Sequence, residues 1–109
     1  MRSATRKHLS VVGGIARFAM VTVAEAAKEA PNDHKPLLFL NDRNVEHFTS
    51  EETKLIEAAV QGLREAEAKL NWQGLPLRVV KVDSSYVDMH PEAARLAAIA
   101  AATELIQGK

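Results

Sequence analysis

The chain of 109 residues contains no cysteine, which excludes disulfide bonds, thiol catalysis and cysteine-ligated zinc. It also has no net charge, because 14 Lys and Arg balance 14 Asp and Glu. A polycation that holds nucleic acid by bulk charge alone is therefore excluded. Glycine and proline are few, at five and four residues, which excludes collagen-like and low-complexity chains.

Long hydrophobic runs are absent as well. Arg17 interrupts the apolar stretch from Leu9 to Ala24, which falls short of the ~20 apolar residues that a membrane-spanning helix needs. Basic residues before this stretch give it the outline of a secretory leader, but the charge inside it disfavours that interpretation. We expect no membrane association and, by default, a cytoplasmic location.

The composition that remains is that of an ordinary soluble domain. Hydrophobic residues make up 47% of the chain and charged residues 26%. A chain of this length can form one domain around a single two-layer core. We therefore expect one domain over residues 1–109, beginning with a basic arm at residues 1–10.

The clearest predicted element is a helix from Thr49 to Leu70. Thr49 followed by Glu52 matches a capping box. Gly62 lies inside this helix, where it costs up to about 1 kcal/mol relative to Ala, so we expect a close helix–sheet contact there. Apolar residues at steps of three and four form one stripe along the helix: Leu55, Ile56, Ala59, Val60, Leu63, Ala66 and Leu70.

A second helix is predicted from Pro91 to about Gln107, with Asp88 or His90 as its cap. Most of the apolar residues in this segment are alanines, whose small side chains make the helix thin. A thin helix can approach a sheet or another helix closely.

Short apolar runs predict strands at Leu37–Leu40 and Leu77–Val82. In the segment Arg17–Ala24, successive side chains alternate in the way typical of a strand. The residues of Ala24–Ala30 favour a helix, so the sequence allows either a strand with a helical tail or one helix throughout. The order of elements predicts an α+β fold, with two helices on one face of a small mixed sheet.

Sequence signatures of catalysis are missing. Gly13 and Gly14 match neither of the glycine-rich phosphate-binding patterns. The four histidines show no metal-ligand spacing: His8, His34, His47 and His90. We therefore expect no enzymatic activity, no cofactor, no metal and no bound nucleotide.

Basic and aromatic residues are the remaining candidates for function. Two aromatics, Trp72 and Tyr86, lie near turns, where they could stack on RNA bases while cations contact phosphates. The alternative, which composition alone favours, is that Trp72 packs over a helix end and Tyr86 caps the core. The cations lie near the start of the chain: Arg6, Lys7, His8 and Arg17.

Four segments of the chain, in order, resemble domain IV of elongation factor G. Lys7 and His8 before residues 13–17 (GGIAR) resemble that family's basic stretch and its Gly-Gly-x-Gly-Gln motif. Residues 62–66 (GLREA) resemble the Gly-Ile-Arg-Glu-Ala of its helix, and residues 74–76 (GLP) its Gly-Tyr-Pro loop. Residues 83–90 (DSSYVDMH) resemble its Asp-Gly-Ser-Tyr-His-Asp-Val-Asp, before an Ala-rich helix. The match covers about Lys7 to Ile106, and it departs from the family's motifs at Ala16, Arg17 and Val87.

The resemblance implies a ribosomal protein S5 domain 2-like fold: a two-layer sandwich of a four-stranded mixed sheet and two helices, with an unusual left-handed crossover. It also implies a strand at Arg17–Ala24. In that family, loops at one end of the domain contact RNA in the ribosome. Carried onto this sequence with the basic and aromatic residues, the RNA-binding candidates are Arg6, Lys7, His8, Gly13, Gly14, Arg17, Trp72, Gln73, Ser85, Tyr86 and His90.

These observations lead to one main hypothesis and two alternatives. The main hypothesis is a non-enzymatic, translation-factor-like module, without a GTPase of its own, that binds ribosomal or other structured RNA through its loop end. The first alternative is a protein-interaction or self-associating domain on the same fold, with no RNA role, which the zero net charge favours. A small-molecule enzyme has the least support, because a fold does not imply a function.

Overall fold

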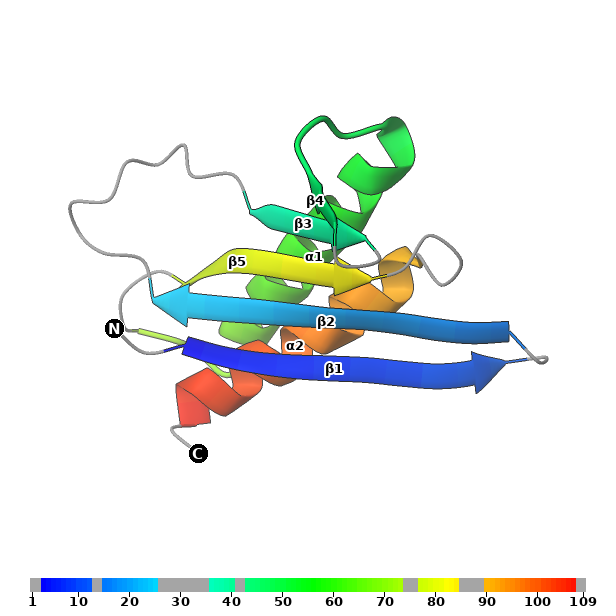
Figure 1. Ribbon diagram of the computed structural model, residues 1–109. Helices are drawn as coiled ribbons and strands as arrows, with labels where there is room; N and C mark the ends of the chain where they lie inside the picture. Colours follow the sequence, from blue (N-terminus) through cyan, green and yellow to red (C-terminus); the bar gives the residue numbers. More distant parts are fainter. Residues whose placement is uncertain are drawn as a thin grey trace.

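The computed structural model describes residues 3–12, 15–25, 36–40, 43–73, 77–84 and 90–107. It consists of two layers, a five-stranded sheet and two helices that cover one face of it (Figure 1). The expected α+β fold with two helices on one face of a mixed sheet is confirmed, with five strands where four were expected. The elements follow in the order β1 (Ser3–Val12), β2 (Ile15–Glu25), β3 (Leu37–Leu40), β4 (Arg43–Val45), α1 (Ser50–Lys69), β5 (Leu77–Ser84) and α2 (Pro91–Gln107).

The sheet has the strand order β1-β2-β5-β3-β4. β3 and β5 pair in parallel, while all other neighbours are antiparallel. After β3 and β4 the chain passes through α1 behind the sheet and returns in β5 beside β3 (Figure 1). This path makes the connection between the two parallel strands left-handed, a hand that is rare in proteins and that the resemblance implies.

A strand takes the place of the expected basic arm. β1 starts at Ser3 and pairs with β2 in an unbroken antiparallel register, from Ser3 opposite Ala24 to Val12 opposite Ile15. The same pairing confirms a strand for the segment Arg17–Ala24, which lies wholly within β2. Sequence alone could not show this, because β1 carries few of the residue types that favour strands and is held mainly by its partner.

The first helix begins at the predicted capping box. The Thr49 hydroxyl accepts a hydrogen bond from the Glu52 amide at 3.3 Å, and the Glu52 carboxylate accepts one from the Thr49 amide at 3.1 Å. Both bonds satisfy amides that have no partner within the helix. The predicted stripe is confirmed as the core side of α1, with Leu55 and Leu63 fully buried.

Gly62 faces the second helix instead of the sheet. A Cβ atom placed on Gly62 would lie 2.3 Å from the carbonyl oxygen of Arg95 on α2. The expected close helix–sheet contact is therefore wrong at this position. The close approach is between the two helices, because a bare backbone on α1 meets the backbone of α2.

The thin second helix lies against α1 and against β1 and β2. Six of its alanines are at most 1% exposed, so most of its inner side is backbone and methyl groups, and Leu105 near its end is the one large buried side chain among its described residues. No helix in the described part of the chain is long and apolar enough to cross a membrane. Large side chains fill the core between the layers: Val21, Val23, Leu38, Leu40, Leu55, Leu63, Leu77 and Val82.

Candidate functional site

The candidate site is the face of the sheet that the helices leave uncovered, which we call the open face (Figure 1). Side chains alternate along a strand, so every second residue points to this face. On β2, Ala19, Val21 and Val23 are fully buried under the helices, so the residues between them point the other way. Strand pairing then assigns these described residues to the open face: Ser3, Thr5, Lys7, Leu9, Phe18, Met20, Thr22, Ala24, Leu37, Phe39, Asn44, Arg78, Lys81 and Asp83.

Two rows of cross-strand neighbours form the middle of the open face. The first row contains Lys7, Met20, Asp83 and Phe39, and the second contains Thr5, Thr22, Lys81 and Leu37. Within the second row the hydroxyls of Thr5 and Thr22 form a hydrogen bond of 2.8 Å. Two large apolar side chains of the open face are exposed: Leu37, at the end of the second row, by 48%, and Leu9, beside the first row, by 58%. The open face is thus a mixed surface of cations, hydroxyls and apolar groups.

Lys81 links the charged and aromatic parts of the open face. Its Nζ atom lies 4.6 Å from the centre of the Phe39 ring, which is a cation–π distance. The same atom lies 3.6 Å from Oδ2 of Asp83, on the neighbouring open-face position of β5. These two contacts hold the ammonium group close to the sheet, while the side chain of Lys81 stays 39% exposed.

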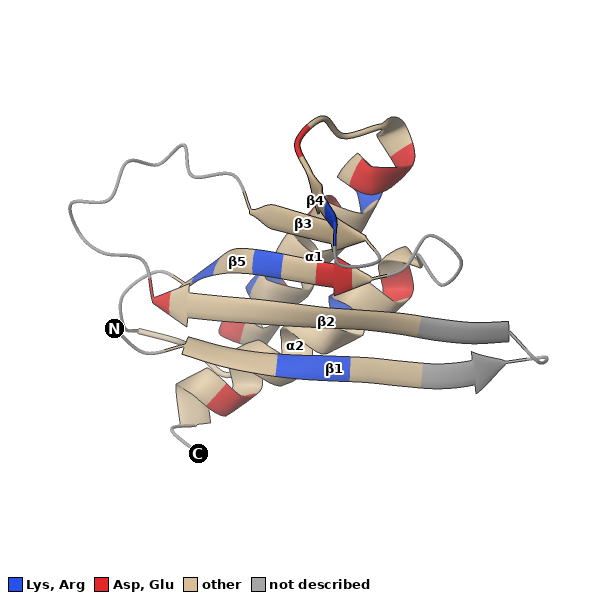
Figure 2. Ribbon diagram, viewed as in Figure 1, with Lys and Arg blue, Asp and Glu red and all other residues tan. Residues whose placement is uncertain are grey.

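Charge is divided between the two layers. The five strands contain six Lys and Arg against two Asp and Glu, whereas the two helices contain four against seven. Figure 2 shows basic residues on β1, β4 and β5 and several acidic residues on the helices. Among the described side chains, the open face carries three cations, Lys7, Arg78 and Lys81, and one carboxylate, Asp83. The zero net charge therefore conceals a basic sheet layer on an acidic helical layer.

The basic residues predicted as one cluster are divided between the two sides of β1. Lys7 is exposed on the open face, opposite Met20. Arg6 points to the helical side, where its guanidinium binds Glu104 of α2 at 3.0 and 3.2 Å. His8 lies opposite the fully buried Ala19 and so has the same orientation as Arg6. Of these three candidates, only Lys7 contributes to the open face.

The loop candidates do not gather at one end of the sheet. Trp72 and Gln73 follow α1 at the end where β5 begins, beside the end of β2. His90 lies at the other end, between the end of β5 and the start of α2. Trp72 and Gln73 therefore do not share one end of the sheet with His90, and RNA binding by these residues stays a prediction. Trp72 is partly buried and packs against the core. This agrees with the alternative interpretation of Trp72 as a packing residue.

Four of the candidates, Gly13, Gly14, Ser85 and Tyr86, lie outside the described residues, as does the side chain of Arg17. His90 is described and half-buried. Its carbonyl oxygen accepts hydrogen bonds from the amides of Ala93 and Ala94, so His90 stands where α2 begins. Its Nδ1 atom is buried and has no hydrogen-bond partner among the described residues.

The first turn of α2 contains a carboxylate with a shifted pKa. The pKa of Glu92 is lowered, mainly because its carboxylate accepts hydrogen bonds from Arg95, against a smaller opposing effect of burial. The charges of His90 and His8 lower it further. In the described residues, no three His, Asp or Glu side chains come together in a way that could hold a metal ion.

Sequence reasoning missed Phe18, Phe39, Arg78 and Lys81 as site residues. The alternation along residues 17–24 already placed Phe18 on one side with Met20 and Thr22. What was missing is the pairing of β3 with β5, which brings Phe39 beside Asp83 and within reach of Lys81. A pairing between distant segments leaves no local signal in the sequence.

No protein-family model matches the chain, and no curated protein matches it either. The structural feature from which a function can be proposed is therefore the open face, with its charge and its aromatic side chains.

Proposed function

We propose that this chain is a non-enzymatic RNA-binding module and that the open face of its sheet is the RNA-contact surface. The observation that carries this proposal is the presence of cations and aromatic rings together on the only sheet face that no described helix covers. Unpaired bases stack on aromatic side chains, and Lys and Arg contact the phosphates between them. Phe18 and Phe39 offer the rings, and Lys7, Arg78 and Lys81 the charges.

The resemblance to domain IV of elongation factor G supports RNA as the ligand. The left-handed connection between β3 and β5 supports the fold relationship, because this hand is rare. Ribosomal RNA is therefore the first structured RNA to test. The proposed surface differs from the loop end of the sequence hypothesis, because the described loop candidates lie at opposite ends of the sheet.

The test is a fluorescence anisotropy titration of labelled RNA, with a single-stranded oligonucleotide and a hairpin of the same composition. We expect binding that weakens steeply with salt, with the single strand preferred because its bases are free to stack. Replacing Lys7 with Ala should lower the slope of log affinity against log salt by about 1, since one phosphate contact is lost. The matched control is Lys54→Ala, which removes an exposed cation from the helical layer and should change neither slope nor affinity.

Two results would reject this proposal. One is no binding of either RNA at low salt. The other is an equal loss in the Lys7 and Lys54 variants, which would show attraction by charge in general and no defined surface.

A protein-interaction or self-associating domain is the second candidate function. The exposure of Leu9 and Leu37 on the open face favours it, because large apolar side chains on one face are a feature of protein-binding surfaces. Light scattering decides on self-association: a dimer that Leu37→Glu converts to monomer would support it. A wild-type protein that is monomeric at all concentrations and that binds RNA would support the first proposal instead.

A further inference from the structure

We infer that the outer edge of β1 binds an extended segment of a partner protein, which joins the sheet as an added strand of alternating acidic and uncharged residues. Backbone hydrogen bonds to a sheet edge hold such a segment, and the surroundings of its alternate side chains select it. The site is the edge of the sheet and not its open face. The inference therefore does not depend on the proposed RNA contact.

β1 is the end strand of the sheet, and its outer edge has no neighbouring strand among the described residues (Figure 1). It spans ten residues, Ser3–Val12, with no proline, no glycine and no bulge in its pairing with β2. Such an edge presents a row of backbone amides and carbonyls that can pair with another chain. The strand at the opposite edge, β4, has only three residues. β1 is therefore the place where this sheet is best able to accept a further strand.

A groove passes around the outer edge of β1. Lys7 points to the open face, whereas α2 covers the other face of the sheet, so a space that both of them line lies at the edge of the strand. The volume of this groove is about 410 Å³. Two residues of β1 and four of α2 line it: Arg6, Lys7, Ala100, Thr103, Glu104 and Gln107.

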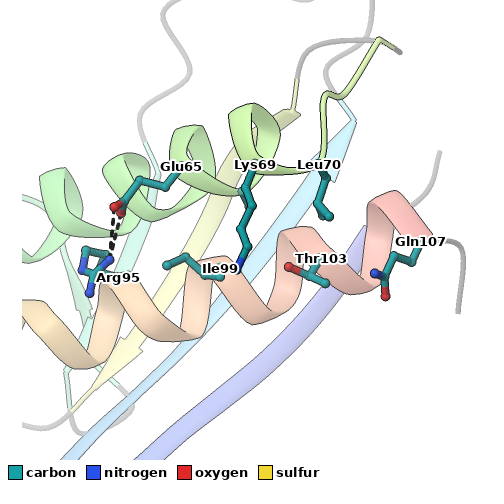
Figure 3. A pocket seen from close by; sticks show the side chains of 8 residues that line it. Glu65, Lys69, Leu70, Arg95, Ile99, Thr103 and Gln107 are labelled. Atoms are coloured by element: carbon teal, nitrogen blue, oxygen red, sulfur yellow. Dashed lines mark hydrogen bonds and ion pairs between the residues drawn. The ribbon is translucent and has the colours of Figure 1, made fainter.

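The wall that α2 contributes to the groove is mainly neutral. Thr103 and Gln107 lie on successive turns at the end of this helix (Figure 3). Ala100 and Gln107 are exposed, so their surfaces are open to a ligand. The carboxylate of Glu104 already accepts hydrogen bonds from Arg6 at 3.0 and 3.2 Å. A side chain that an added strand turns toward α2 therefore meets an uncharged surface, which favours an uncharged residue there.

The charge of β1 favours acidic residues on the other side of the added strand. Three charged residues line the groove, and Arg6 and Glu104 compensate each other, so the positive charge of Lys7 remains. Lys7 is exposed and has no carboxylate partner among the described residues. Opposite charges at directly paired positions stabilise two strands, and like charges destabilise them. A glutamate or aspartate opposite Lys7 is therefore preferred.

A second copy of this chain fits the edge less well than an acidic segment does. β1 contains Arg6, Lys7 and His8 in succession and no Asp or Glu. Pairing two β1 strands over their full length, in either direction, would place this basic segment opposite its own copy. Lysine on an edge strand protects proteins against such self-pairing. An acidic strand meets no such repulsion, so the charge selects a different chain as the partner.

The experiment uses a blocked peptide as long as β1, in which glutamate alternates with valine, and records amide proton–nitrogen NMR spectra of the whole chain without RNA. The signals of β1 should shift with saturation at millimolar peptide, while those of β4 at the other edge stay in place. A peptide with lysine in place of glutamate should bind about tenfold more weakly. Lys7→Glu should reverse this preference.

Two controls separate strand addition from attraction by charge. Lys54→Glu reverses an exposed charge on α1 and should leave the preference for the glutamate peptide unchanged. Two further peptides carry methyl groups on alternate backbone nitrogens, one on the glutamates and the other on the valines. In an added strand only every second amide faces the sheet, so one of these peptides should lose binding and the other should keep it.

Four results would overturn the inference. They are no shift of the β1 signals at millimolar peptide, equal affinities for the glutamate and lysine peptides, equal affinities for the two methylated peptides, and shifts of β1 that depend on protein concentration without peptide. The last result would identify a second copy of the chain as the occupant of the edge. The spectra also report whether each variant is folded.

Discussion

Gly62 illustrates how the role of one residue depends on a distant neighbour. In an isolated helix its replacement by Ala would be favourable by about 1 kcal/mol. Here the added methyl group would meet the carbonyl oxygen of Arg95 at 2.3 Å, a contact that the backbone of α2 must move to relieve. The glycine therefore permits the close approach of the two helices.

We expect Gly62→Ala to lower the free energy of unfolding by roughly 1–2 kcal/mol, because the steric cost exceeds the gain in helix propensity. Urea denaturation measures the change. Gln61→Ala, at the exposed neighbouring position, is the control and should stay within about 0.5 kcal/mol of the wild type. A Gly62→Ala protein more stable than the wild type would show that the helices separate at no cost.

Polar side chains stabilise the start of each helix. At the start of α1 they are Thr49 and Glu52, which form the capping box. Thr49→Ala removes the hydroxyl that accepts from the Glu52 amide, and we expect a loss of about 1 kcal/mol in the free energy of unfolding. Ser50→Ala, at the exposed next residue, should have little effect. Equal losses in the two variants would contradict the assignment of Thr49 as the cap.

In the first turn of α2, the carboxylate of Glu92 accepts a hydrogen bond from Arg95. Arg95 also binds Glu65 of α1. The pKa of Glu92 is lowered in the folded chain. At pH values above its unfolded pKa of 4.5, the ionised carboxylate therefore stabilises the fold. The stabilisation is lost as the pH falls through the lower, folded pKa. When the pH is lowered through the folded pKa of Glu92, the thermal midpoint of the wild type should therefore fall more than that of Glu92→Gln, which has no carboxylate to protonate at this position.

Glu57→Gln is the control for this pH dependence, since Glu57 is an exposed residue of α1 with no ion pair among the described residues. Its midpoint should follow the wild-type profile. If Glu92→Gln also follows that profile, the contact of Glu92 with Arg95 does not contribute to stability.

The helices could be predicted from the sequence because their signals are local. The cap at Thr49, the apolar stripe of α1 and the start of α2 near Pro91 all lie within a few turns of chain. The strands and their faces depend on pairing between distant segments, so β1 was expected as an arm. The same limit explains why Arg6, Lys7 and His8 were grouped, since consecutive residues on a strand point to opposite faces.

The helices and strands that the structure describes divide the charge, with a basic sheet layer carrying the open face and an acidic helical layer on its other side. An anionic polymer approaching this molecule is attracted to the sheet and repelled by most of the helical surface. If RNA is the ligand, as proposed above, this arrangement would orient the chain with its sheet toward the RNA.

The most direct test of the proposed function is to observe which face contacts RNA. Methyl groups mark both layers: Leu9, Met20 and Leu37 on the open face, and Leu70 and Ile99 on the helices. In methyl NMR spectra of the protein titrated with a single-stranded RNA, we expect the open-face signals to shift together while the helix signals stay in place. Shifts confined to Leu70 and Ile99, or no shift in any of the five signals, would contradict RNA binding by the open face.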